Sequence, residues 1–138
     1  MKAISLWQPW ASAVACGAKH IETRSWSTRY RGPLAIHAAR REMDYEADLL
    51  WFALVGHAGY EPACPFGAFV ATCRLVECVP VENLLALGTI EAQFGNYSPG
   101  RYAWILENVV PLASPIPYRG RQGLFEIPEI ILAAEITK

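Results

Sequence analysis

The chain has 138 residues, of which 53% are hydrophobic and 18% are charged, with a formal net charge of -1. This length suffices for one hydrophobic core, and the composition excludes a disordered chain. The near-neutral charge excludes a protein that wraps a nucleic-acid duplex mainly through its phosphates. We therefore expect a single domain over residues 1–138, in which any nucleic-acid contact is small and local.

The first quarter of the chain predicts a strand, a helix and a second strand. An apolar strand over residues 3–7 precedes a helix that begins at Pro9, because proline suits the first helical position. The helix ends at Gly17, which has no side chain to oppose a left-handed cap. The second strand follows over residues 21–26.

Three charged side chains meet at the junction of this helix and strand. Residues 17–24 read GAKHIETR, so Lys19 enters the mouth of the strand, while Glu22 and Arg24 share one face because side chains alternate. Two donors that flank one acceptor suit the edge of a base or an amide. The alternative is a solvated surface ion-pair cluster, which is common and weak.

The rest of the chain predicts more strands and one longer helix. Apolar residues of a strand over 34–38 lie on one face, with Ala35 and His37 on the other. The other expected elements are a helix over 42–55, a long strand over 66–81, one or two helical turns over 81–87, and final strands over 102–112 and 123–127. The proline-rich connection between the final strands should not form a central strand. Short strands with two helices favour an α+β barrel over a βαβ sheet.

The octet fits the G-x-K-x-x-E-x-R signature at Gly17, Lys19, Glu22 and Arg24. On this motif the chain resembles the ASCH domain family, a small β-barrel module of the PUA-like superfamily. The resemblance extends over nearly the whole chain, through residues 5–12, 30–38, 101–104 and 115–125. It implies an α+β fold, a small PUA-like β-barrel with flanking helices.

A helix over the mouth of a barrel leaves a cleft that favours ligands. Tyr30 lies in a loop with glycine and arginine and is the candidate for stacking on a base, whereas Trp7 and Trp10 are expected in the core. The strand position of His37 suits a place in the wall of the cleft, although a lone histidine is more often structural. The candidate ligand-binding residues are Gln8, which resembles a family cleft position, and Lys19, Glu22, Arg24, Tyr30 and His37.

The resemblance implies binding of RNA, a nucleotide or a modified nucleoside, and this is the function that we favour. It also implies a hydrolase alternative, because one branch removes the acetyl group of 4-acetylcytidine and another member acts as a ribonuclease. The acetylcytidine enzymes use the motif lysine, a threonine where this chain has Glu22, and a distant glutamate. In a hydrolase Lys19 and Glu22 would be catalytic, and Glu77, Glu82 or Glu91 could be the distant glutamate. A pure interaction adaptor is the third possibility.

If Lys19 meets a ligand, its replacement by alanine should weaken binding and leave stability nearly unchanged. No C-x-x-C pair and no histidine spacing indicates a metal site, so we expect no metal and no cofactor. No apolar run reaches the ~18 residues of a membrane span. The apolar N-terminus is interrupted too early for a signal peptide, at Gln8, so we expect a cytoplasmic protein with free thiols.

Overall fold

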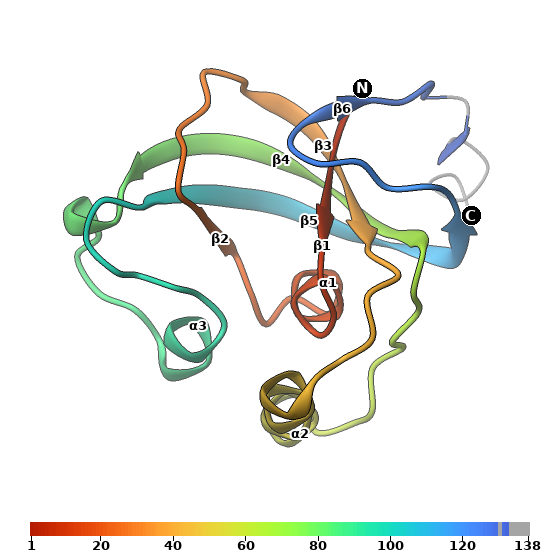
Figure 1. The fold of residues 1–138 in the computed structure, drawn as a ribbon, viewed down its shortest axis with the longest axis horizontal. Coiled ribbons are helices and arrows are strands. Elements are labelled where there is room, and N and C mark those ends of the chain that lie inside the picture. The colour runs from red at the N-terminus through yellow and green to blue at the C-terminus, as the bar shows by residue number, and fades with distance from the viewer. Residues whose placement is uncertain (130, 133–138) are drawn as a thin grey trace.

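The computed structural model describes residues 1–129 and 131–132. Within these residues, six strands and three α-helices are connected in the order β1-α1-β2-β3-α2-β4-α3-β5-β6 (Figure 1). The strands are β1 (Lys2–Leu6), β2 (Ile21–Arg24), β3 (Gly32–Ala38), β4 (Ala68–Pro80), β5 (Tyr102–Pro117) and β6 (Phe125–Glu126). The α-helices are α1 (Trp10–Ala15), α2 (Tyr45–Ala58) and α3 (Thr89–Gln93), and one 3-10 turn covers Val81–Asn83.

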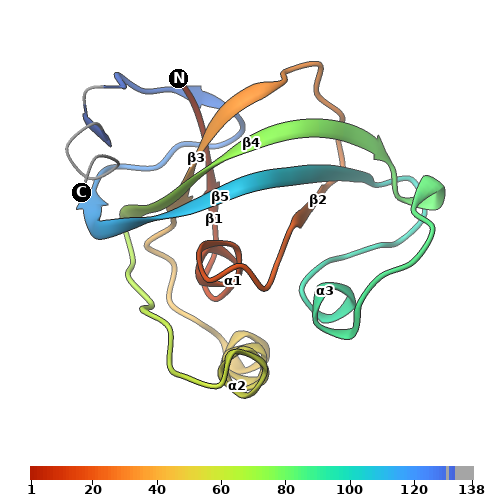
Figure 2. The same cartoon turned by 180° about the vertical axis from the view of Figure 1, so that it is seen from behind.

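One mixed sheet organises the fold, with the strand order β2-β5-β4-β3-β1-β6. Strands β1 and β3 are parallel, and every other pair is antiparallel. The long strands β4 and β5 bend across the molecule, and all three helices lie on the same side of this arch in both views (Figures 1 and 2). The α+β, PUA-like fold is therefore confirmed, but over the described residues the sheet is an open, curved sheet rather than a closed barrel.

Both faces of β3 are buried, because the sheet packs on two hydrophobic clusters. Leu34 and Ile36 pack in the larger cluster with α1 and Trp104. Ala35 packs in the smaller cluster with residues of β4 and of the C-terminal segment. The alternation predicted for this strand is thus confirmed, and it places His37 on the face that looks toward the segment after β5.

Two predicted bounds in the second half were wrong. The strand predicted over residues 102–112 extends to Pro117 and includes part of the proline-rich segment. Within the described residues β2 pairs with β5 only over 102–105, so these prolines lie on a strand edge, in agreement with the prediction that they should not form a central strand. The helical turns predicted over 81–87 shrink to the 3-10 turn, and the unpredicted α3 forms after Gly88.

The other two helices lie near their predicted places, but α1 begins after Pro9 rather than at it, and α2 covers residues 45–58 rather than 42–55. Helix α1 is followed by Gly17 in the left-handed region, with φ of 85°. Helix α2 begins after Asp44, whose carboxylate accepts the backbone N–H of Ala47. No helix among the described residues is long and apolar enough to cross a membrane.

Candidate functional site

Lys19 lies beneath the surface and not at the wall of a cleft. Its side chain is 1% exposed, and Nζ donates to the carbonyl oxygens of Phe94, at 2.6 Å, and of Ile21. The Nζ atom also lies 3.7 Å from Glu22 Oε1 and 4.0 Å from Glu91 Oε1. Burial lowers the pKa of Lys19, whereas the two carboxylates oppose this change. Lys19 therefore joins α3, its flanking residues and β2 into one unit.

Glu91 is the distant glutamate that reaches the motif. Its two carboxylate oxygens accept the backbone N–H groups of His20, at 2.9 Å, and Ile21, at 3.1 Å. The other two candidates lie elsewhere, because Glu77 pairs with Arg31 and Glu82 accepts the backbone N–H of Gly100. Of the three glutamates, Glu91 is thus the one that contacts the motif, and a catalytic role for it stays a prediction.

Arg24 lies at the solvent-facing end of the cluster that begins with the buried Lys19. Its Nε and Nη2 atoms lie 3.1 Å and 3.0 Å from Glu22 Oε2, and Nη2 also donates to the carbonyl oxygen of Ser5 at 3.1 Å. Since Glu22 also faces Lys19, the motif side chains form one chain of contacts that ends at the Arg24 guanidinium. The predicted convergence of these charges is therefore confirmed, and Arg24 is its outermost cation.

Like Lys19, the predicted site residues Gln8 and Tyr30 lie outside both clefts described below. Gln8 is buried, and its amide bridges the carbonyl oxygen of Pro65 and the backbone N–H of Ser12. The hydroxyl of Tyr30 donates to the carbonyl oxygen of Pro33, and its ring packs beside the larger core cluster. Both side chains are thus engaged by the protein itself, and ligand binding by either stays a prediction.

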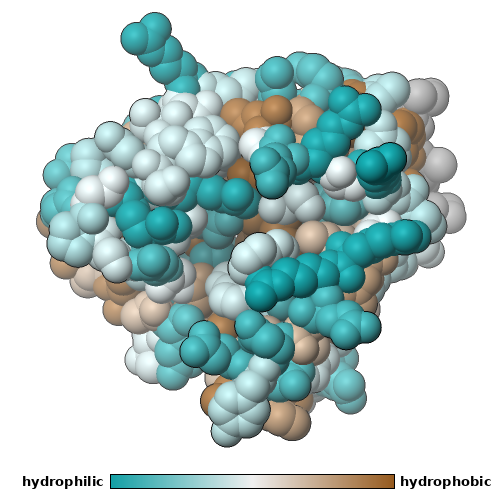
Figure 3. Space-filling model, viewed as in Figure 1, coloured by the Kyte–Doolittle hydropathy of each residue, from teal (hydrophilic) through white to brown (hydrophobic). Residues whose placement is uncertain are grey.

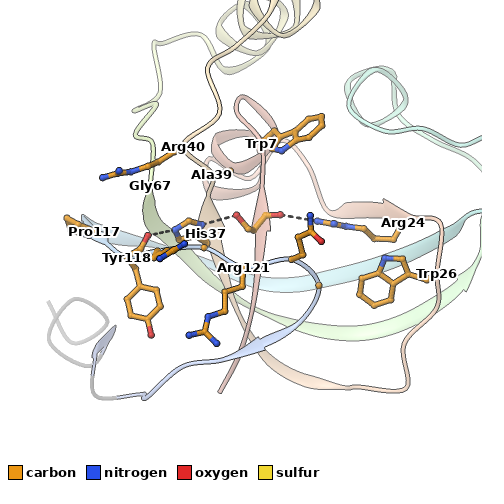
Figure 4. Close-up of a pocket in the computed structure, with 15 residues that line it drawn as sticks. Trp7, Arg24, Trp26, His37, Ala39, Arg40, Gly67, Pro117, Tyr118 and Arg121 are labelled. Carbon is orange, nitrogen blue, oxygen red and sulfur yellow. Dashed lines mark hydrogen bonds between the residues drawn. The ribbon is translucent and has the colours of Figure 1, made fainter.

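The larger of the two clefts is basic, and we call it the arginine cleft. It measures about 1110 Å³ and opens between β1, β2 and the segment after β5. In Figure 3 hydrophilic residues surround a hollow on this face, and Figure 4 shows the cleft in detail. Among the described residues no carboxylate lines it, but four arginines do: Arg24, Arg40, Arg119 and Arg121. Arg40, Arg119 and Arg121 form no ion pair within the described part of the chain, so their charges are available to an anion.

The smaller cleft adjoins it, and we call it the motif cleft. It measures about 540 Å³ and shares Ser5, Trp7 and Arg24 with the arginine cleft. Its wall mixes apolar side chains such as Trp10 and Phe94 with hydrogen-bonding ones, namely Glu22, Glu46, Gln93 and Asn96. Such a mixture suits a flat ring with polar edges.

Trp7 stands where the two clefts meet. It was predicted in the core but is 53% exposed, and the guanidinium of Arg41 lies 3.6 Å from the centre of its ring. Trp26, on the other side of Arg24 in Figure 4, is 37% exposed and meets Trp104 edge-on. These two tryptophans replace Tyr30 as the aromatic surfaces near the clefts.

His37 lies on the floor of the arginine cleft, as its strand position predicted. Its Nδ1 atom is 2.9 Å from Ser5 Oγ, and its Nε2 atom is 2.6 Å from the carbonyl oxygen of Tyr118. Burial lowers the pKa of His37, and the Tyr118 carbonyl opposes this change. Sequence reasoning missed Ser5, since nothing in its neighbourhood marks the partner that β3 brings beside it.

No cluster of three potential metal-ligating side chains occurs in the described ranges. The arrangement therefore offers anion binding by arginines, stacking on tryptophans and hydrogen bonding to a ring edge.

Comparisons with known proteins agree with this fold. The chain is 27% identical over 128 residues to Activating signal cointegrator 1 of Mus musculus and of Homo sapiens, which covers 90% of this chain and 22% of each relative. The chain thus spans about a fifth of the length of these curated relatives.

Solved structures of ASCH from Zymomonas mobilis also superpose on this structure. The one without substitution has a TM-score of 0.58 and 16% identity, with 99% of this chain and 92% of that chain covered. A mutant of the same protein, in which one tyrosine is replaced by phenylalanine, has a TM-score of 0.59 and 16% identity, with coverage of 99% and 96%. The model of the ASCH domain family matches residues 4–116, and the chain belongs to this family.

Proposed function

We propose that this protein binds single-stranded RNA, with the sugar-phosphate backbone along the arginine cleft and one base in the motif cleft. The observation that carries the proposal is the arginine cleft itself, which four arginines and no carboxylate line among the described residues, and where only Arg24 of the four forms an ion pair. Membership of the ASCH family supports a role in RNA binding, and the curated relatives contain a matching segment within a longer chain.

The two clefts differ in the part of a nucleotide that they suit. Arginine forks pair with phosphate oxygens, so the unpaired Arg40, Arg119 and Arg121 suit a backbone. The motif cleft offers a carboxylate acceptor at Glu22 and an amide at Asn96 beside apolar walls, which suits the edge and face of one base. Trp7 lines both clefts, so a base stacked on its ring would lie between the backbone in the arginine cleft and the base in the motif cleft.

The motif acts in this proposal through Arg24. Glu22 fixes the guanidinium from one side, and Lys19 and Glu91 fix Glu22 and β2 from below. The polar atoms of Lys19 contact protein groups, so the geometry gives no specific support to hydrolysis by Lys19 and Glu22. RNA binding without turnover at these two residues is the function that the contacts favour.

The test is the affinity for a short fluorescent single-stranded RNA across a salt series. The variant Arg119→Ala/Arg121→Ala removes two cleft charges, and Arg29→Ala/Arg31→Ala removes the same charge from a loop outside both clefts. With four arginines at the backbone, the logarithm of affinity should fall with the logarithm of salt with a slope of roughly two to three, at about 0.7 per contact. The cleft variant should lose affinity and lower the slope, whereas the loop variant should change neither.

Equal losses in the two variants would contradict the proposed location of the backbone. Binding of a duplex as tight as that of the single strand would contradict the proposed base in the motif cleft, because a paired base is not free to enter it.

A further inference from the structure

Ser5 and His37 form a hydrogen-bonded pair that RNA binding does not use. They face each other in the register of the parallel strands β1 and β3, and Figure 4 shows the contact of His37 with Tyr118. The carbonyl oxygen of Tyr118 can only accept, so His37 Nε2 carries the imidazole proton and donates it. His37 Nδ1 is then the acceptor, and the hydroxyl of Ser5 donates to it.

The segment after β5 approaches this pair at Gly120. A Cβ atom at that position would lie 2.7 Å from His37 Nδ1 and 2.9 Å from Ser5 Oγ, which is too close for any residue but glycine. The backbone N–H groups of Gly120 and Arg121 donate to no group in the described part of the chain. Both residues line the arginine cleft together with Ser5, so their N–H groups are candidate donors to an oxygen atom bound there.

A serine whose proton is held by a histidine, itself oriented by a third group, is the arrangement that activates a hydroxyl nucleophile. Here Nδ1 is the base and Nε2 is the oriented atom, which reverses the roles of the two nitrogens in the serine protease triad. His37 is 1% exposed, whereas Ser5 is partly exposed and lines both clefts. Both residues line the arginine cleft, and the hydroxyl of Ser5 is the more exposed of the two groups to a molecule bound there.

We propose that Ser5 is the nucleophile of a hydrolase that cleaves a carboxylic ester carried by a phosphate-bearing molecule. Ser5 Oγ attacks the carbonyl carbon, its proton passes to His37 Nδ1, and the carbonyl oxygen becomes negative beside the N–H groups of Gly120 and Arg121. The tetrahedral intermediate then releases the alcohol, which takes the proton from His37, and leaves an acyl-serine. Water attacks the acyl-serine with His37 as base, which releases the carboxylic acid and restores Ser5.

The cleft around the pair defines the carrier. Arg40, Arg119 and Arg121 form no ion pair within the described residues, so they can bind a phosphate on the ester, whereas an ester without a phosphate gains no such contact. The proposal stands on the Ser5–His37 pair and does not need a bound RNA strand. If this protein hydrolyses such an ester but binds no RNA, the hydrolase proposal stands and the RNA-binding proposal fails.

The experiment follows acetate release from 3′-O-acetyl adenosine 5′-monophosphate by NMR, with 3′-O-acetyladenosine as the phosphate-free comparison. Ser5→Ala and His37→Gln should each slow release at least about 100-fold. Ser27→Ala is the matched control, because Ser27 is exposed and lines neither cleft, and it should hydrolyse as the wild type does. The phosphate-free ester should react more slowly than the nucleotide ester.

A fluorophosphonate probe with mass spectrometry provides a second measurement on the wild-type protein, which decides the matter even if Ser5→Ala does not fold. The expected result is one adduct, on Ser5. Acetate release no faster than in buffer, full activity in a folded Ser5→Ala variant, or no adduct on Ser5 would each overturn the proposal.

Discussion

Replacing Lys19 by methionine should destabilise the protein, although the sequence motif predicted a loss of ligand binding alone. The change keeps most of the buried aliphatic chain and removes the charge that meets Glu22, Glu91 and two carbonyl oxygens. Breaking one side of a buried ion pair costs about 3–5 kcal/mol. Glu22 keeps Arg24 and Glu91 keeps two backbone N–H groups, so the lower end, about 3 kcal/mol, applies. For a chain of this size that corresponds to a fall in melting temperature of about 10 °C.

The assay is thermal and urea unfolding of Lys19→Met beside Lys2→Met, which removes the same charge from a side chain that is 33% exposed. The exposed pair of Lys2 with Glu126 should contribute little to stability, because solvent screens it. If Lys19→Met has the same melting temperature as Lys2→Met but binds RNA more weakly than it does, Lys19 contacts the ligand and the structural reasoning is refuted.

Three further outcomes are expected. Trp7→Ala should weaken RNA binding by about 1–3 kcal/mol with little change in melting temperature, because its exposed ring is a stacking surface; unchanged affinity would contradict that. The pKa of His37 is lowered in the folded protein, so its neutral form contributes fully to stability above about pH 6.5. This contribution is lost as the pH falls through the lower pKa of the folded state. The free energy of unfolding, measured with urea, should therefore decline with falling pH, and His37→Gln should lessen the decline. A chelator should leave the melting temperature unchanged, and a fall would reveal a metal site.

Local patterns predicted the elements that depend on local physics. Alternation identified β3, the glycine after α1 adopts the left-handed conformation, and the contact of Glu22 with Arg24 follows from strand geometry. The same patterns could not reveal that Lys19 is buried. Its partners Glu91 and Phe94 lie about 70 residues or more away along the chain. Glu91 is in α3, a short helix without a strong sequence pattern, and Phe94 is the residue that ends this helix.

The arginine cleft was harder to predict, because its charges come from separate places in the chain. A net charge of -1 hides them, since acidic residues elsewhere balance the sum. The short sequence Arg119-Gly120-Arg121 was a signal, and its meaning depends on Gly120 approaching β1 and β3. Only the topology shows that this segment crosses the strands that hold Ser5 and His37.

The position of Glu22 explains why one fold supports different chemistry in one place. Its carboxylate has two oxygens, one toward Lys19 and one toward Arg24, so it ties the buried lysine to the arginine between the clefts. A threonine at this position, as the acetylcytidine enzymes have, offers one hydroxyl and no charge to hold the guanidinium. The lysine and hydroxyl would then be the reactive pair, whereas here the same site holds Arg24 in place. The motif in this chain therefore holds Arg24 in place, and in our two proposals Arg24 contacts the ligand while the nucleophile comes from another strand, where Ser5 lies.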